Sequence, residues 1–303
     1  MADVTDPRAG THDLRSFFRA VGRFSGQRAL QSAPPERVDA DHPVEMLEHL
    51  TARVVADPLE VAAWCDGIQA SLVVTHREHR PVYLSYVAAG AVADWGRPVA
   101  VDERLEVVCS EADEEWVDSV RATIPSRILS VTSPPEVEGA AVAALGAGRE
   151  AAERRLAEEQ ITRPGVVAVD GGLVGRPSRA PDRLVGYVKS AQRRYLPDES
   201  VLYGLAPGWR SPMFRIPAGA GSAKARYSAY VRLHDASHAG WAHGLIRVET
   251  FSKDLIGPAA ARALAERQSA ASGDGRWDRH LGPIRACEEF LRARRPSVYT
   301  LGL

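Results

Sequence analysis

Two Asp-Gly pairs lie at the edges of apolar segments, where their carboxylates can take part in chemistry. One is Cys65-Asp66-Gly67, and the other is Val169-Asp170-Gly171-Gly172, which closes a short valine-rich run. A carboxylate at the edge of an apolar strand is costly to bury unless it meets a cation, hydrogen-bond donors or a metal. Two of them suggest a shared divalent ion, and the glycines would let a substrate backbone approach. Asp-Gly is also a common turn dipeptide, so each aspartate could instead cap a turn.

A third carboxylate is expected from the Ala-, Glu- and Arg-rich segment over residues 137–160, whose composition predicts a helix. We select Glu153, with Glu150 one turn earlier on nearly the same face. The alternative is that these glutamates pair with neighbouring arginines on a solvated face. Lys189 follows a strand-like segment and could neutralise a phosphate oxygen; the alternative is an ordinary solvated lysine.

The segments around these residues predict an α/β fold with a mixed sheet. Residues 63–75, 81–92 and 105–110 are rich in valine, leucine and tyrosine and predict three antiparallel strands. The predicted helix follows, and then the run from Val166 to Leu173, typical of a strand buried on both faces. This is the layout of an RNase H-like core, in which acids from the first strand, the helix and the fourth strand converge on Mg²⁺ or Mn²⁺.

Further elements are expected on both sides of this core. Apolar residues at 46, 47, 50, 54 and 55 have helical spacing and predict an amphipathic helix after Pro43. Strand-like segments cover residues 184–190, 211–217, 227–234 and 245–251, and helices are predicted over residues 258–272 and 281–294. Residues 1–43 are polar and predict an N-terminal arm or helical cap with a helix over residues 13–25. Residues 44–303 are expected to form the main domain.

Composition limits the possible classes of protein. The 303 residues carry 38 basic and 39 acidic side chains, a net charge of −1, so no global positive charge indicates a nucleic-acid binder. Three cysteines without CxxC spacing argue against a disulfide framework or a zinc ribbon. The acidic N-terminus and the absence of a long apolar run predict a cytoplasmic protein that neither is exported nor spans a membrane.

Several short strings, in their order along the chain, resemble the pattern of NurA-type nucleases over most of residues 60–295. They are the early Asp66-Gly67, the helix with Arg149 and Glu153, Val169-Asp170-Gly171-Gly172-Leu173, Gly186-Tyr187-Val188-Lys189-Ser190, Tyr227-Ser228-Ala229-Tyr230-Val231-Arg232-Leu233, and Arg247-Val248-Glu249. The resemblance implies a nuclease with an RNase H-like fold, flanked by helical N- and C-terminal additions, that acts on DNA ends with Mn²⁺ or Mg²⁺. It also implies a homodimer that works with a HerA-type hexameric ATPase, in DNA repair or in defence against foreign DNA.

By the same resemblance, Asp66, Glu153 and Asp170 are the expected metal ligands. The family has a Tyr, a Pro-containing turn and then a His on the next helix. Here His280 stands in the place of the Tyr and Glu288 in the place of the His. Glutamate can ligate a metal as histidine can, so Glu288 is an expected fourth ligand. This departure also supports the alternative of a catalytically weak adaptor that binds DNA and the ATPase. A third hypothesis is an RNase H-like enzyme that acts on RNA or branched DNA.

Three other features have simpler alternatives. The Gly-rich residues 217–224 fail the phosphate-loop spacing and predict a plain loop. His234, His238 and His243 could form a metal site or a solvated loop. Basic residues interleaved with aromatics would suit a DNA groove or an ordinary core; they are Arg193, Arg194, Arg210, Arg215, Arg226 and Arg232, among Tyr195, Tyr203, Trp209, Phe214, Tyr227 and Tyr230.

Overall fold

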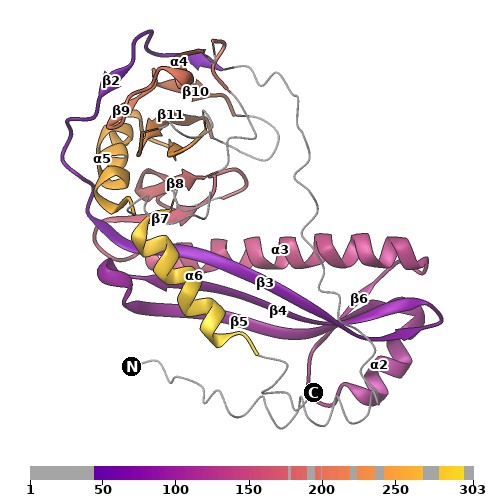
Figure 1. Ribbon diagram of the computed structural model, residues 1–303. Helices are drawn as coiled ribbons and strands as arrows, with labels where there is room; N and C mark the ends of the chain where they lie inside the picture. Colours follow the sequence, from indigo (N-terminus) through magenta and orange to yellow (C-terminus); the bar gives the residue numbers. More distant parts are fainter. Residues whose placement is uncertain are drawn as a thin grey trace.

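A computed structural model describes residues 44–176, 179–189, 195–198, 200–218, 224–235, 242–268 and 280–296. These residues form an α/β structure built on one mixed sheet in the order β1-β10-β11-β12-β8-β7-β3-β4-β5-β6 (Figure 1). The predicted fold class, a large mixed sheet flanked by helices, is confirmed at that level. The expected arm over residues 1–43 lies outside the described residues.

Three long antiparallel strands form one half of the sheet: β3 (Val61–Arg77), β4 (Arg80–Val92) and β5 (Pro98–Ser110). Between β3 and β4, Glu78 and His79 both have positive φ, which a two-residue hairpin turn of this twist requires. The strands occupy the predicted segments but are longer, most clearly β5, which begins seven residues before the predicted start.

The chain then turns back along the sheet. After α2 (Glu114–Val120), β6 (Ser126–Leu129) pairs in parallel with β5, and α3 (Pro134–Gln160) runs across one face of the long strands (Figure 1). Sequence reasoning missed α2 and β6. The chain re-enters the sheet as β7 (Val166–Asp170), parallel to β3, and β8 (Leu184–Val188), parallel to β7.

The second half of the sheet is antiparallel. Next to β8 lies β12 (Leu245–Thr250), followed by β11 (Arg226–Arg232), β10 (Phe214–Ile216) and β1 (Glu45–Met46). A side branch pairs β2 (Ala52–Arg53) with β9 (Trp209–Arg210), and α4 (Ser200–Tyr203) is a single turn nearby. The helices α5 (Ile256–Glu266) and α6 (Gly282–Arg294) confirm the two predicted C-terminal helices.

The predicted amphipathic helix after Pro43 is wrong. Its segment contains β1 and β2, which pair with β10 and β9 as edge strands. Leu50 and Val55, two of the apolar residues at helical spacing, are exposed. The backbone pairing offered by two neighbouring strands outweighs the helical pattern here.

Two buried layers hold the sheet between its helices. On one face Trp64, Ala168 and Tyr187 pack with α5 and α6. On the other, Cys65, Val169 and their neighbours pack against α3. Within the described residues, no helix is long and apolar enough to cross a membrane.

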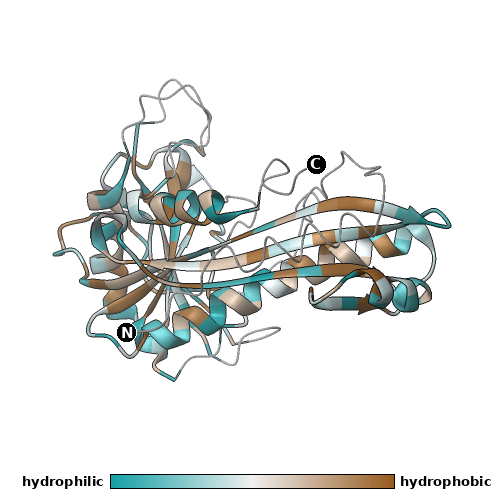
Figure 2. Ribbon diagram, turned by 90° about the horizontal axis from the view of Figure 1, so that it is seen from below, coloured by the Kyte–Doolittle hydropathy of each residue, from teal (hydrophilic) through white to brown (hydrophobic). Residues whose placement is uncertain are grey.

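A smaller buried cluster, here named the distal cluster, lies at the outer end of the long strands. It consists of Val74, Val82, Leu84, Val107, Cys109, Val117 and Ile124. Figure 2 shows the long strands extending from the main body towards this second group of elements. We call the part of β3, β4, β5 and α3 that joins the two the stem.

Candidate functional site

The two predicted aspartates lie on neighbouring parallel strands. Cys65 of β3 and Val169 of β7 form the last pair between these two strands. The next residues, Asp66 and Asp170, therefore lie side by side just beyond it. β7 ends there, whereas β3 continues into the stem, so the sheet forks at the aspartates. By strand alternation both face the α6 side of the sheet. The sequence prediction that they come together agrees with this geometry.

Asp66 is buried in this fork, and its charge is poorly compensated. The Asp66 side chain accepts a hydrogen bond from the Gly67 N–H at 2.7 Å, and Asp66 is only 6% exposed. Burial and the neighbouring charges of Asp170 and Glu153 raise the pKa of Asp66 well above its usual range, against the lowering effect of Lys189. A second positive charge at this place would relieve that repulsion.

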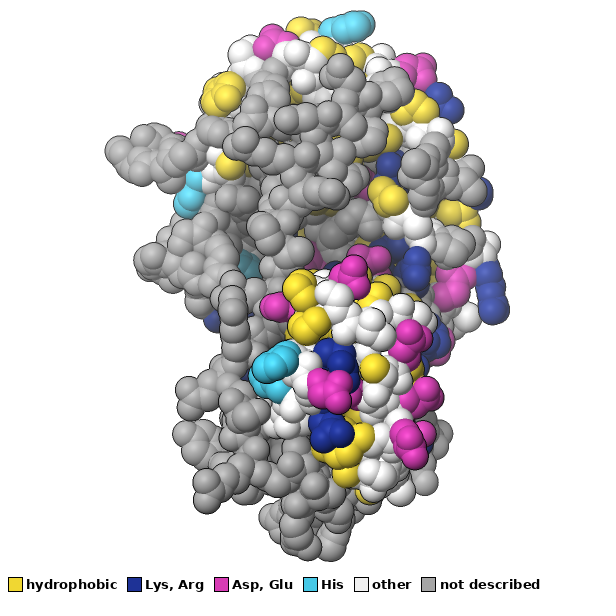
Figure 3. Space-filling model, turned by 90° about the vertical axis from the view of Figure 1, so that its right-hand side faces the viewer, with side chains coloured by type: hydrophobic (Ala, Val, Ile, Leu, Met, Phe, Trp, Pro, Cys, Tyr) yellow, Lys and Arg dark blue, Asp and Glu magenta, His cyan; other side chains and the backbone are white. Residues whose placement is uncertain are grey.

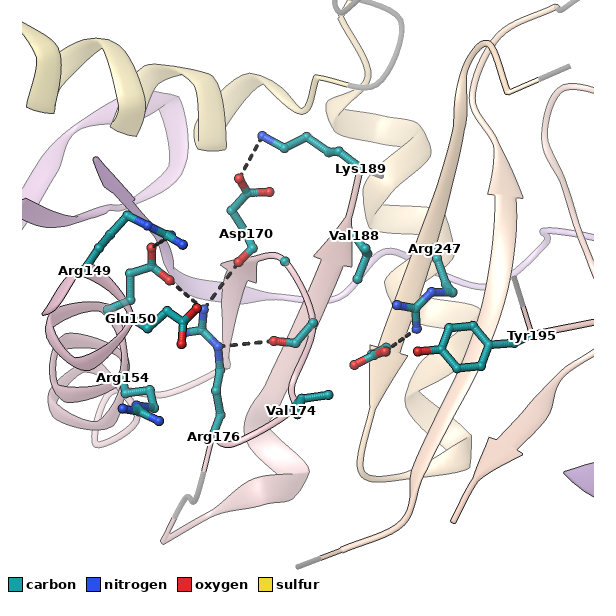
Figure 4. A pocket seen from close by; sticks show the side chains of 14 residues that line it. Arg149, Glu150, Arg154, Asp170, Val174, Arg176, Val188, Lys189, Tyr195 and Arg247 are labelled. Carbon is teal, nitrogen blue, oxygen red and sulfur yellow. Dashed lines mark hydrogen bonds and ion pairs between the residues drawn. The ribbon is translucent and has the colours of Figure 1, made fainter. Parts of the chain in front are cut away.

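Lys189 follows β8 and points back to Asp170, with 2.9 Å between Nζ and Oδ2 (Figure 4). Burial lowers the pKa of Lys189, but the charges of Asp170 and Asp66 outweigh this and leave it above its ordinary value. Lys189 is therefore charged at neutral pH, and it forms a partly exposed ion pair with Asp170. Lys189, for which the sequence suggested a role in neutralising a phosphate oxygen, thus lies beside Asp170.

Glu153 approaches the fork from the opposite face of the sheet. It lies on α3 beside Gly67, where a Cβ would come within 2.5 Å of its Oε1. The carboxylate is buried and held by two arginines, Arg149 one turn earlier and Arg176 at 2.7 Å. Glu153 therefore lies near Asp66, as its effect on the pKa of Asp66 shows, but it is already neutralised. Glu150 lines the cavity described below.

The two C-terminal residues of interest lie near the aspartates. Glu288 of α6 accepts a hydrogen bond from Arg292 at 2.6 Å, and its charge helps to raise the pKa of Lys189. Burial and the charge of Lys189 lower the pKa of His280, although Glu288 and Asp170 oppose this. His280 and Glu288 therefore both interact electrostatically with Lys189, and Glu288 also forms an ion pair with Arg292.

A cavity of about 560 Å³ opens beside Asp170, over β7, β8 and β12 and next to α3 (Figure 4). Its lining alternates basic and acidic side chains: Arg149, Arg154, Arg176, Lys189 and Arg247 with Glu150, Glu153, Asp170 and Glu249. A second cavity of about 550 Å³ on the other side of Arg149 reaches Gly67 and Glu288. The side chains drawn in Figure 3 likewise mix both charges.

The residues at the fork partly fit a divalent ion. Asp66 and Asp170 offer hard oxygen donors of the kind Mg²⁺ and Mn²⁺ prefer, and Lys189 only partly offsets their repulsion. Glu153 and Glu288 are occupied by arginines. Among the residues that the structure describes, no group of three or more His, Cys, Asp and Glu side chains is arranged to hold a metal.

The other features considered in the sequence are mainly structural where they are described. Arg232 is fully buried and donates to the carbonyls of Leu202 and Leu205, and Arg226 is also buried. Phe214 and Tyr230 belong to a buried cluster. The burial of these four residues fits the alternative of an ordinary core, whereas Tyr203 and Trp209 are exposed. His238, Arg193, Arg194 and most of the Gly-rich loop lie outside the described residues.

Sequence reasoning gave no role to Arg176 or to the buried charge of Glu249. Arg176 lies in the turn after Asp170, 23 positions from Glu153, so no helical or strand periodicity in the sequence links the two residues. Glu249 had a visible signal: Arg247 and Glu249 alternate with apolar residues in the strand Leu-Ile-Arg-Val-Glu-Thr, which places two opposite charges on one face. No protein-family model and no curated protein matches this sequence.

Proposed function

We propose that the protein is a divalent-metal-dependent nuclease that hydrolyses phosphodiester bonds at DNA ends, as the resemblance to NurA-type nucleases implies. The observation that carries this proposal is the fork between β3 and β7. There Asp66 and Asp170 lie side by side, burial and the charge of Asp170 raise the pKa of Asp66, and Lys189 lies 2.9 Å from Asp170 and only partly offsets this. A carboxyl group with a raised pKa, here Asp66, next to a carboxylate that lines a cavity, here Asp170, is typical of catalytic sites.

The order of elements supports the same proposal. A three-strand meander, β3 to β5, is followed by the long helix α3 and by β7, which pairs in parallel with the first strand of the meander. This order, with α2 and β6 inserted between β5 and α3, supports the proposal that the fold is RNase H-like.

Each residue at the fork has a proposed role. Asp66 and Asp170 would hold Mg²⁺ or Mn²⁺, which when bound supplies an activated water and charge stabilisation for the leaving oxygen. Lys189 binds a non-bridging oxygen of the phosphate and offsets its developing negative charge. Arg149 and Arg176 orient Glu153 at the back of the fork, and Glu288 remains a proposed further ligand.

The wider assignments rest on the resemblance. We infer a cytoplasmic homodimer that takes DNA from a HerA-type hexameric ATPase, in end processing or in defence against foreign DNA.

The test is digestion of end-labelled linear DNA, single- and double-stranded, with Mn²⁺, with Mg²⁺ and with EDTA. We expect cleavage that requires the metal. Asp170→Asn, which keeps the shape of the side chain, should lower the rate by about 100-fold or more. The matched control is the exposed Asp182, for which Asp182→Asn should leave the rate unchanged. Full activity in Asp170→Asn would refute the site.

A second candidate function is a catalytically weak DNA-binding subunit of a HerA-type ATPase complex. The pairing of Glu153 and Glu288 with arginines favours it, because both expected ligands are already occupied. Thermal unfolding with and without Mn²⁺ separates the candidates. A nuclease should be stabilised by Mn²⁺ in the wild type and not in Asp170→Asn, whereas an adaptor that binds no metal should respond in neither.

A further inference from the structure

Glu249 is a buried charge on β12, two strands away from Asp170 in the sheet. It is 1% exposed, and it forms ion pairs with Arg247 and Arg226, the latter at 3.5 Å. Burial raises the pKa of Glu249, but the two arginines outweigh it and hold the pKa below its ordinary value. Buried ion pairs of this kind contribute little net stability compared with apolar side chains of similar size. Stability therefore does not explain this carboxylate.

The carboxylate reaches the turn that follows Asp170. Its Oε2 accepts a hydrogen bond from the Leu173 N–H at 2.8 Å, across 76 positions of the chain. The second oxygen is held by Arg247, whose guanidinium lies 4.6 Å from the centre of the Tyr195 ring. Arg247, itself packed on Tyr195, thus holds the Glu249 carboxylate in place while its Oε2 accepts from Leu173.

Two glycines make this contact possible. Gly186 of β8 pairs directly with Glu249, and a Cβ there would lie 2.7 Å from the carbonyl oxygen of Gly171. A Cβ on Gly172 would lie 3.1 Å from Glu249 Oε2. The turn therefore lies flat over β8, with its backbone against the carboxylate.

The same turn fixes the direction in which Asp170 leaves β7. Gly171 donates its N–H to the Tyr187 carbonyl at 2.9 Å and has a φ of 89°. Arg176 donates to the carbonyls of Gly172 at 3.3 Å and of Asp170 at 3.4 Å, and the charged hydrogen bond from Leu173 to Glu249 is shorter, at 2.8 Å. Hydrogen bonds to ionised groups are stronger than neutral ones, and they are well suited to hold a short turn in one conformation.

We propose that Glu249 is a positioning residue that fixes the turn after Asp170, and with it the Asp170 carboxylate, from the neighbouring half of the sheet. The role in cleavage rests on the proposed nuclease function. The positioning itself concerns the backbone and has its own readout.

The test uses the full chain with Glu249→Ala, Glu249→Gln and a matched control. Glu106 is also a buried glutamate, 4% exposed and paired with an arginine at 2.8 Å, but it lies on β5. Glu106→Ala therefore reports the general effect of breaking a buried ion pair. Hydrogen–deuterium exchange over residues 171–175 and the kcat and KM for DNA cleavage are measured for all four proteins.

In Glu249→Ala we expect exchange over residues 171–175 to be about tenfold faster or more. We expect kcat to fall by about 10- to 100-fold while KM stays the same, because Glu249 is 1% exposed and its two oxygens are engaged by the Leu173 N–H and by Arg247. Glu249→Gln keeps an oxygen acceptor, so its exchange rate and its kcat should lie between those of the wild type and Glu249→Ala. If Glu249→Ala does not fold, Glu249→Gln decides the question. Glu106→Ala should leave both readouts at these residues unchanged.

The proposal is overturned if residues 171–175 exchange at the wild-type rate in a folded Glu249 variant, or if Glu106→Ala has the same effects. If the wild type cleaves no DNA under any condition, the nuclease function fails. The exchange measurement then still decides whether Glu249 holds the turn.

Discussion

Asp66 illustrates what the fork does to a single side chain. Its carboxylate is buried beside Asp170 and Glu153, so the folded state favours its protonated form. That Asp66 lies beside Asp170 could be predicted from the sequence, because both are acids next to glycine at the edges of apolar strands. The ion pair between Glu153 and Arg176 could not, since only the folded turn brings Arg176 to α3.

The raised pKa of Asp66 predicts a stability that falls with increasing pH in metal-free buffer. Below about pH 4 both the folded and the unfolded states are protonated at this residue. As the pH rises towards the folded pKa, the unfolded state releases its proton first, and stability is lost. Asp66→Asn cannot ionise. Its Tm should exceed that of the wild type by roughly 2 °C or more at high pH and converge with it near pH 4.

The measurement is thermal unfolding in EDTA across this pH range, with Asp182→Asn as an exposed control. A difference between Asp66→Asn and the wild type that stays constant with pH would show that the raised pKa of Asp66 does not govern stability.

At the scale of elements, the packing of α3 on β3 decides where Glu153 lies. The three long strands were predictable because parts of β3, β4 and β5 are rich in valine, leucine and tyrosine, whereas α2 and β6 were missed. The segment with β1 and β2 was not predictable, because its short strands exist only by pairing with partners about 160 residues later in the chain. Periodicity within a segment carries no information about such partners.

Gly67→Ala is predicted to disturb this packing. The new Cβ would lie 2.5 Å from Oε1 and 2.8 Å from Cγ of Glu153, and the two arginines leave that side chain little freedom to move. We expect a loss of about 1–3 kcal/mol in the free energy of unfolding, together with reduced cleavage. Denaturant unfolding measures the first and the DNA assay the second.

Gly139→Ala on the same helix is the matched control. Nothing lies within 4 Å of a Cβ at that position, so the alanine should stabilise α3 by about 0.5–1 kcal/mol and leave cleavage unchanged. Equal effects of the two substitutions would contradict the proposed contact between Gly67 and Glu153.

At the scale of the whole molecule, the distal cluster and the site are separated by the stem. The distal cluster shares no fully buried side chain with the two layers around β7, and the partly buried Leu105 packs against both it and the layer on the α6 side. Local opening at the distal end therefore need not reach the fork. From the sequence, the valines of the long strands indicated burial but not that they serve two separate cores.

Ile124→Ala is predicted to loosen only the distal cluster. Ile124 is buried there, and its truncation should lower the local free energy of unfolding by about 2–5 kcal/mol. Hydrogen exchange should accelerate in α2 and β6 while residues 166–170 keep their protection, and the rate of DNA cleavage should stay the same. Faster exchange at both ends would show that the two cores open together.

The stem also limits how such a chain can lengthen in evolution. Residues added to α3 on the distal side of Glu153 must complete whole helical turns to keep the same face on the sheet, and residues added to β3, β4 and β5 must come in even numbers. Eighteen helical residues, five turns, span about 27 Å, and eight strand residues span about the same length. Inserting eighteen residues in α3 together with eight in each of β3, β4 and β5 would therefore move the distal cluster outward without changing the orientation of Asp66, Glu153 and Asp170.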